Sequence, residues 1–333
     1  MIKRLLSIRE LGIALVLLVE IAVFAWLLRQ PGQRNVFLGS EAFLKVVRDT
    51  AVLGVAAIGT TIVIISGGID LSVGSVIALA TVTAAAVLKA GWAPVAAVPA
   101  AVLVGLACGQ VTAAVINLAK LPPFIVTLGM MSIARGGAFL LTRGSTITLI
   151  DSPYARAVNA DLRLGPLLVP APVVVLVAVA LGCALLMSRT TFGRAVFALG
   201  GNEEAARLSG LRVARLKRLV YGLAGACAGL AGCLFVGQYS TGQSTAAAGW
   251  ELDAIAAAVL GGASLSGGRG SIVGTCLGAL IFRVLLRGLT MLNASDYSQV
   301  ITGVVVIVVV VLDQVATARA RRAAAAAREE TVR

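Results

Sequence analysis

Long apolar runs, separated by short polar or glycine-rich segments, dominate the chain. A helix that crosses a bilayer needs about 20 mostly apolar residues, and most of these runs reach that length. The pattern predicts an all-α polytopic membrane protein of about ten transmembrane helices, with broken or short helices at two Gly-rich turns. The predicted spans lie at residues 11–28, 50–69, 71–88, 91–119, 121–142, 164–188, 219–237, 250–260, 270–289 and 297–312.

Three segments depart from a simple span. The run at 11–28 follows basic residues, as the core of a signal peptide does, but no small-x-small cleavage site comes after it. It is therefore expected to be an uncleaved first helix. The apolar residues 254–260 are too few to cross alone and are expected to span together with 250–253. Residues 40–49 are expected to form a short interfacial helix before the second span.

The composition supports a membrane protein, because 59% of the residues are hydrophobic, the mean hydropathy is +0.98 and only 13% are charged. Soluble domains carry about 25% charged residues, so a water-soluble enzyme is excluded. The five cysteines lie in apolar runs without a CxxC pair, and the chain has no histidine, so neither a metal site nor a cofactor is expected. Without histidine or paired carboxylates deep in the runs, an intramembrane enzyme is disfavoured, and the chain is predicted not to be an enzyme.

The net charge of +13 is unevenly distributed, since 15 of the 28 Lys and Arg residues fall within 1–10, 188–218 and 313–333. Basic residues concentrate in cytoplasmic loops, so both termini and the middle loop are expected on the cytoplasmic side. The basic patches lack interleaved aromatic residues, so no nucleic acid partner is expected. The chain is expected to divide into a transmembrane domain at 1–318, with its cytoplasmic loop at 188–218, and a cytoplasmic Ala/Arg-rich tail at 319–333 that binds anionic membrane lipid.

The segment 66–75 (Ser-Gly-Gly-Ile-Asp-Leu-Ser-Val-Gly-Ser) places a carboxylate between glycines and serines, at the junction of two apolar runs. Irregular backbone at membrane depth is tolerated where it is buried in protein or lines a cavity, and discontinuous helices mark binding sites in several transporters. Asp70, Ser72 and Ser75 are therefore candidates for a translocation pathway or its gating. The alternative, a cytoplasmic turn in which Asp70 only caps the next helix, stays open.

A second glycine-rich segment, 261–271, shares the pattern Gly-Gly-x-x-Leu-Ser-x-Gly with residues 67–74 at an offset of 194 residues. The two segments are either a duplicated helix–turn–helix, as in other transporter folds, or a chance similarity between glycine-rich sequences. Ser264 and Ser266 join the pathway candidates. Arg135 and Asp253 join them as well, because ionisable residues within membrane spans are functional candidates by default. Glu20, Arg283 and Arg287 are expected to reach the membrane surface instead.

The largest basic loop contains a short helix signal at 203–209. Asn202 is a good N-cap, Glu203 and Glu204 suit the positive end of the helix dipole, and Gly210 fits the C′ position. An ordered helix in such a loop indicates docking to a partner, with an interfacial helix on lipid as the alternative.

Four stretches together resemble the permease subunits of bacterial ABC importers for ribose, xylose, rhamnose and related sugars, in the branched-chain amino acid permease superfamily. They are 67–75, 121–129, 193–210 and 260–274, and the resemblance extends from about residue 48 to 312. It implies a multi-pass protein of the bacterial cytoplasmic (inner) membrane that translocates a monosaccharide. Thr127, in the second stretch, is a further pathway candidate.

The resemblance also implies three protein partners: a cytoplasmic ABC ATPase subunit, a periplasmic sugar-binding protein and a second permease copy or paralogue. The capped helix would then couple to the ATPase, through Gly200, Gly201, Asn202, Glu203, Glu204, Ala205 and Arg207. The chain has no Gly-Lys-Ser/Thr phosphate loop, which fits hydrolysis of ATP by a partner. The alternative function is an ion-coupled secondary transporter, in which Asp70 is the one strong candidate for a carboxylate relay.

Overall fold

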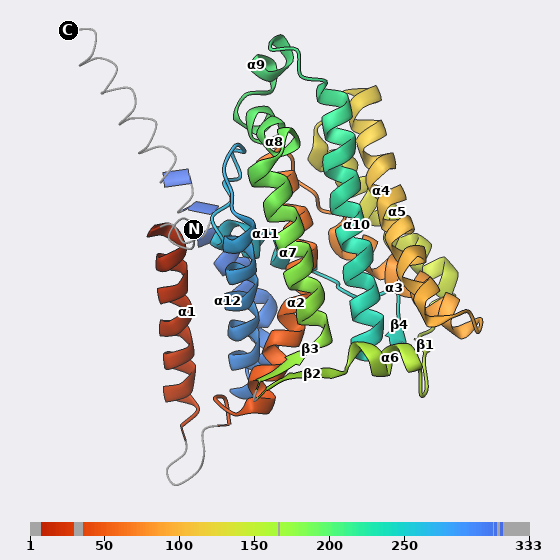
Figure 1. Ribbon diagram of the computed structural model, residues 1–333, viewed down its shortest axis with the longest axis vertical. Helices are drawn as coiled ribbons and strands as arrows, with labels where there is room; N and C mark the ends of the chain where they lie inside the picture. Colours follow the sequence, from red (N-terminus) through yellow and green to blue (C-terminus); the bar gives the residue numbers. More distant parts are fainter. Residues whose placement is uncertain (1–7, 30–35, 166, 309, 312–313, 316–333) are drawn as a thin grey trace, which may run out of the picture.

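The computed structural model describes the chain except for residues 1–7, 30–35, 166, 309, 312–313 and 316–333. The predicted lipid-binding tail at 319–333 lies outside the described residues. In the described part, long helices run up and down beside one another and form an upright bundle (Figure 1). These helices are α1 (Ile8–Leu27), α2 (Ser40–Ile65), α3 (Val73–Lys89), α4 (Ala97–Ala119), α5 (Pro123–Thr142), α7 (Ala171–Arg189), α10 (Val213–Tyr239) and α12 (Ile272–Met291).

Shorter elements connect the long helices at both ends of the bundle. At the end drawn uppermost in Figure 1 lie α8 (Thr191–Gly201) and α9 (Glu203–Leu208). At the opposite end lie α6 (Pro153–Val158) and two antiparallel strand pairs, β1 (Ile147–Thr148) with β4 (Thr241–Gly242) and β2 (Asp161–Leu164) with β3 (Leu167–Pro170). The remaining elements are α11 (Trp250–Leu260), η2 (Pro94–Ala96) and η3 (Ser295–Tyr297), and an apolar helix continues from η3 to Val308.

An all-α polytopic membrane protein is confirmed as the coarse fold, whereas ten spanning helices are not confirmed. Among the described residues, six helices are long and apolar enough to cross a membrane, and three more apolar helices are shorter. The expectation that 250–260 forms a span is wrong, because α11 has 11 residues. At about 1.5 Å per residue it covers only about half of a bilayer core of about 30 Å.

Two predicted boundaries are also wrong, and both errors lie at the end of the bundle that carries the strands. Residues 40–49 are the first turns of α2 rather than a separate interfacial helix. Two of their charged residues bind partners at the same end: Arg48 binds Asp161 at 2.6 Å, and Asp49 accepts a hydrogen bond from the Tyr239 hydroxyl. The predicted span from 164 begins instead at Ala171, because residues up to Pro170 belong to the β2–β3 hairpin.

Glycines allow α4 and α10 to approach at backbone distance. A Cβ on Gly105 would collide with the carbonyl oxygen of Gly225, and a Cβ on Gly109 would collide with that of Tyr221. Small residues at helix interfaces permit such contacts in membranes, where packing replaces the hydrophobic effect as the force that joins helices. The α10 helix also packs against α2 and α3, so it lies at the centre of the core.

We expect Gly109→Ala to destabilise the fold, whereas Gly129→Ala in α5 does not, because no atom lies within 4 Å of a Cβ at Gly129. Both changes gain the same helix propensity, so the difference isolates the collision, which typically costs about 1–3 kcal/mol. The measurement is the fraction of monodisperse protein left after heating in detergent. Equal melting of the two variants would contradict the close packing of α4 on α10.

Candidate functional site

Three backbone segments meet beneath α9, and we call this meeting point the glycine junction. It comprises the α2–α3 connection (66–72), the C-terminal end of α8 (200–201) and the α11–α12 loop (261–271). The Gly268 amide donates a hydrogen bond to the Ile65 carbonyl at 2.9 Å. A Cβ on Gly200 would collide with the same carbonyl, and a Cβ on Gly267 would lie 2.5 Å from the Gly200 carbonyl oxygen. Only glycine fits these positions, so the three segments are held by backbone contact.

The α2–α3 connection contains Asp70, which is buried, with 8% of its surface exposed. The alternative in which Asp70 is the N-cap of the following helix does not hold, because Ser72 occupies the N-cap position. Asp70 Oδ1 instead accepts hydrogen bonds from the Ser72 amide at 2.8 Å and the Ser72 hydroxyl at 2.6 Å. No Lys or Arg in the described part of the chain forms an ion pair with it.

Thr127 attaches α5 to this connection. Its hydroxyl donates to the Ile69 carbonyl at 3.3 Å and to the Phe124 carbonyl at 3.1 Å. The threonine within the 121–129 motif therefore contacts the residue next to Asp70, which places these two predicted residues in one region.

The two glycine-rich segments end their helices in the same way. Gly67 and Gly262 both have positive φ (83° and 98°), and their amides donate to the carbonyls of Ile64 and Val259, both at 2.9 Å. Beyond these caps they differ: 68–72 continues to the start of α3, whereas the second loop closes through a bond from the Ser264 amide to the Arg269 carbonyl. Ser264 is buried and Ser266 is exposed. Duplication of a helix–turn–helix stays a prediction.

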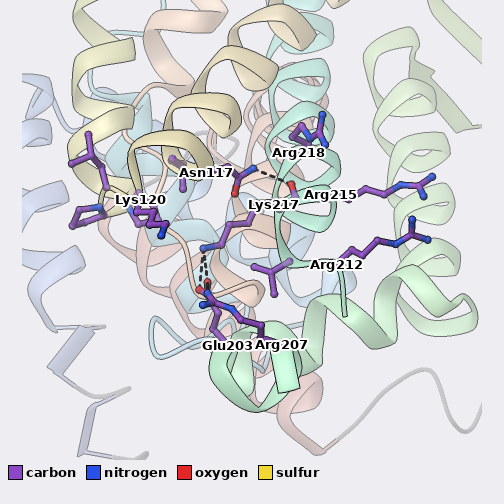
Figure 2. A pocket seen from close by; sticks show the side chains of 14 residues that line it. Asn117, Lys120, Glu203, Arg207, Arg212, Arg215, Lys217 and Arg218 are labelled. Carbon is purple, nitrogen blue, oxygen red and sulfur yellow. Dashed lines mark hydrogen bonds and ion pairs between the residues drawn. The ribbon is translucent and has the colours of Figure 1, made fainter. Parts of the chain in front are cut away.

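The short helix of the basic loop forms as predicted, with its last residue at Leu208. Asn202 Oδ1 accepts a hydrogen bond from the Ala205 amide at 3.0 Å, so it is the N-cap. Gly210 has φ +85° at the C-terminal end. The helix lies at the end of the bundle drawn uppermost in Figure 1. Its Glu203 forms an ion pair with Lys217 of α10 at 2.9 Å (Figure 2).

A second region surrounds the start of α11, where residues 243–249 are irregular. Arg135 of α5 donates from Nη1 to the carbonyls of Ser244 and Ala246, both at 2.7 Å. Non-helical backbone at membrane depth leaves carbonyls without partners, and unsatisfied polar groups are costly in lipid. The arginine therefore supplies the hydrogen bonds that this broken segment lacks.

The first turn of α3 reaches the same place. A Cβ on Gly74 would lie 2.5 Å from the Ala247 carbonyl oxygen and 2.5 Å from Glu251 Oε2. The two discontinuous elements thus meet at their helix starts, with Ser75 buried beside the contact. Glu251 Oε2 is itself buried without a hydrogen-bond partner in the described part of the structure.

A cavity of about 450 Å³ lies next to this contact, between α11, α12 and the helix that follows η3. Its polar lining comprises Trp250, Asp253, Arg283, Ser298, Gln299 and Thr302. The Arg283 guanidinium lies over the Trp250 ring, 4.3 Å from its centroid.

Trp250 is not among the residues that the sequence singles out, and Arg283 is predicted from the sequence to reach the membrane surface. Arg283 does not simply extend to the surface, since its Nε and Nη2 are buried. The sequence does contain a sign of this polar region: two acidic residues at 251 and 253, and two arginines at 283 and 287 in the next apolar run.

The predicted pathway residues fall into two groups rather than one. Asp70 and Thr127 lie near the glycine junction, with Ser72 beside Asp70 and Ser264 and Ser266 in the α11–α12 loop. Ser75, Arg135 and Asp253 lie around the start of α11. The described residues contain no group of three or more acidic or cysteine side chains that could hold a metal ion.

Comparison with known proteins decides the family. Residues 42–310 match the family model described as "Branched-chain amino acid transport system / permease component". The chain belongs to this permease family. It is therefore a transport component of a membrane system and not an enzyme. No solved structure matches the chain.

Several curated relatives are similar to this permease over most of its length. The ribose import permease protein RbsC of Escherichia coli (strain K12) is 43% identical over 81% of this chain and 84% of its own length. RbsC of Bacillus subtilis (strain 168) is 40% identical over 81% and 83%. The autoinducer 2 import system permease protein LsrD of Yersinia enterocolitica (serotype O:8, biotype 1B) is 36% identical over 89% and 88%.

We expect Arg135→Leu to destabilise the permease, because it leaves the Ser244 and Ala246 carbonyls without their donor. Each buried unsatisfied group costs about 1–3 kcal/mol, so the apparent melting temperature in detergent should fall by several degrees. Arg156→Leu, at an exposed position of α6, is the control and should melt like the wild type. If the two variants melt alike, Arg135 does not support the irregular segment.

Proposed function

We propose that this permease is the membrane-spanning subunit of an ATP-driven ABC importer that translocates a monosaccharide delivered by a periplasmic binding protein. The carrying observation is the family match over 42–310, together with relatives named as import permeases for ribose and autoinducer 2. These relatives favour ABC import over the ion-coupled secondary transporter. The permease is a multi-pass protein of the bacterial inner membrane.

The geometry of α9 supports a role in coupling. The chain lacks a Gly-Lys-Ser/Thr phosphate loop, so a cytoplasmic ABC ATPase subunit would hydrolyse the ATP. The helix lies at the tip of the bundle drawn uppermost in Figure 1, and its Leu208 is 80% exposed. The coupling residues Gly200 and Gly201 end α8, and Asn202 to Arg207 begin and form α9. A displacement of α9 would move α8, whose last residues contact the glycine junction.

The same assignment orients the molecule. The end with α8 and α9 would face the cytoplasm, and the end with the strand pairs would face the periplasm (Figure 1). Both termini would then be cytoplasmic, with a permease domain at 1–318 whose coupling loop is 188–218 and a cytoplasmic tail at 319–333. A second permease copy or a paralogue would complete the pathway, and membrane lipid would cover the exposed apolar faces of α1, α4 and α5.

The start of α11 is our candidate for the translocation pathway. The cavity beside Trp250 and Asp253 offers an aromatic ring and hydrogen-bonding groups, which suit a neutral sugar. Discontinuous helices line binding sites in other transporters. Asp70 and the neighbouring serines would act in gating, because the connection that holds them joins the cytoplasmic junction to this region.

Leu208→Asp should abolish association with the ATPase and leave the membrane level of the permease unchanged, because an exposed side chain contributes little to the fold. The measurement is co-purification of the ATPase with tagged permease. The same change at Leu162, in the exposed hairpin at the other end, is the control and should retain the ATPase. ATPase recovery at the wild-type level with Leu208→Asp would argue against α9 as the coupling helix.

Asp70→Asn should be expressed normally and lose most sugar uptake. The Asn side-chain oxygen can accept the same two bonds from Ser72, so the local fold is kept. A buried carboxylate without an ionic partner is costly and is usually functional. The measurement is uptake of radiolabelled ribose, normalised to the amount of permease in the membrane. Asp70→Leu serves as a second variant, because it removes the hydrogen bonds to Ser72 and so shows how far their loss lowers the membrane level of the permease. Wild-type uptake by Asp70→Asn would restrict Asp70 to a structural role.

A further inference from the structure

A cleft of about 800 Å³ lies beside α9, between the C-terminal end of α4, the start of α5 and the start of α10 (Figure 2). We call it the basic cleft, because six basic residues and one acidic residue line it. The basic residues are Lys120, Arg207, Arg212, Arg215, Lys217 and Arg218, and the acidic residue is Glu203.

The one carboxylate that lines the cleft already forms ion pairs with two of these basic residues. Glu203 binds Lys217 at 2.9 Å and Arg207 at 3.2 Å. The other four basic residues form no ion pair within the described part of the chain. Figure 2 shows Lys120 and Lys217 on the side of the cleft that faces Glu203, while Arg212 and Arg215 extend outward along its rim. The cleft therefore carries excess positive charge that no carboxylate of the described residues neutralises.

The α4–α5 wall of the basic cleft combines the apolar residues Ile116, Leu121, Pro122 and Pro123 with the polar residues Asn117 and Lys120. Just beyond it, the surfaces of α4 and α5 expose more apolar side chains, including Leu118 (84% exposed), Phe124 and Leu128. Both helices are apolar enough to span a membrane and bury only a third or less of their apolar windows within the chain. The cationic residues of the cleft thus adjoin an exposed apolar surface on two helices that are apolar enough to span a membrane.

We propose that the basic cleft binds the phosphate headgroup of an anionic phospholipid, with the acyl chains lying along α4 and α5. Basic pockets between transmembrane helices on the cytoplasmic side are suited to such headgroups. An acidic protein surface would match the cations but not the apolar surface next to them. Because Glu203 and Arg207 belong to α9, the bound lipid braces this helix against α10. This consequence for transport depends on the proposed coupling role of α9, whereas binding itself does not.

The test compares binding of phosphatidylglycerol and phosphatidylcholine to the full-length permease in detergent by native mass spectrometry. The cleft variant is Lys120→Gln/Arg212→Gln. The matched control is Arg189→Gln/Arg194→Gln, which removes two exposed charges outside the cleft at the same end of the bundle. Each basic residue close to the bound headgroup contributes about fivefold, so the cleft variant should bind phosphatidylglycerol roughly thirtyfold more weakly. Arg189 and Arg194 do not line the cleft, so the control should match the wild type.

Equal phosphatidylglycerol binding by the cleft variant and the control would overturn the proposal. Displacement of the lipid by millimolar inorganic phosphate would also overturn it, because the cleft would then be a site for soluble phosphate. Loss of ATPase co-purification with unchanged lipid binding would assign the cleft to a protein surface instead. Weakened lipid binding together with an unaffected ATPase-driven transport would retain the lipid site and remove only its link to coupling.

Discussion

Backbone contact between glycines is the constraint on which the rest of the structure depends. A helix that breaks inside a packed bundle leaves buried amide and carbonyl groups that need partners within the protein. Here the broken ends satisfy one another, since the Gly268 amide binds the carbonyl of Ile65 at the end of α2. This bond forms because Gly200 and Gly267 leave no side chain between the segments. The junction that solves the hydrogen-bonding problem also brings α8 into direct contact with both interrupted helices.

The start of α11 meets the same constraint in a different way. There residues 243–249 form turns before the helix, and Arg135 of a neighbouring helix donates hydrogen bonds to the Ser244 and Ala246 carbonyls. An arginine among apolar residues therefore need not contact the substrate. The acids Glu251 and Asp253 are the stronger functional candidates in this region, because Glu251 Oε2 has no partner in the described structure and Asp253 lines the cavity.

The sequence allowed the class of fold and the short capped helix to be predicted, because both depend on local chemistry. The length of an apolar run indicates a membrane span, and Asn202 and Gly210 are residues typical of the two ends of a helix. The half-length of α11 and the hairpin before α7 could not be predicted, since apolar composition does not distinguish a span from a buried half-helix or strand. The separation of Asp70 from Arg135 and Asp253 required the path of the 66–72 connection, which depends on tertiary contacts.

The connections of α9 to the bundle differ in strength, which bears on how a displacement would travel. The Glu203–Lys217 pair is partly exposed, with 41% of the glutamate side chain accessible, and such pairs contribute at most about 1 kcal/mol. By contrast, α8 is anchored through buried Val196 and Leu199, and its last residues touch the junction at backbone distance. The ion pair can therefore orient α9, but it is too weak to hold the helix in place when a partner displaces it. A displacement of α9 would reach the α2–α3 and α11–α12 connections through α8, and both connections would move together because one glycine contact joins them.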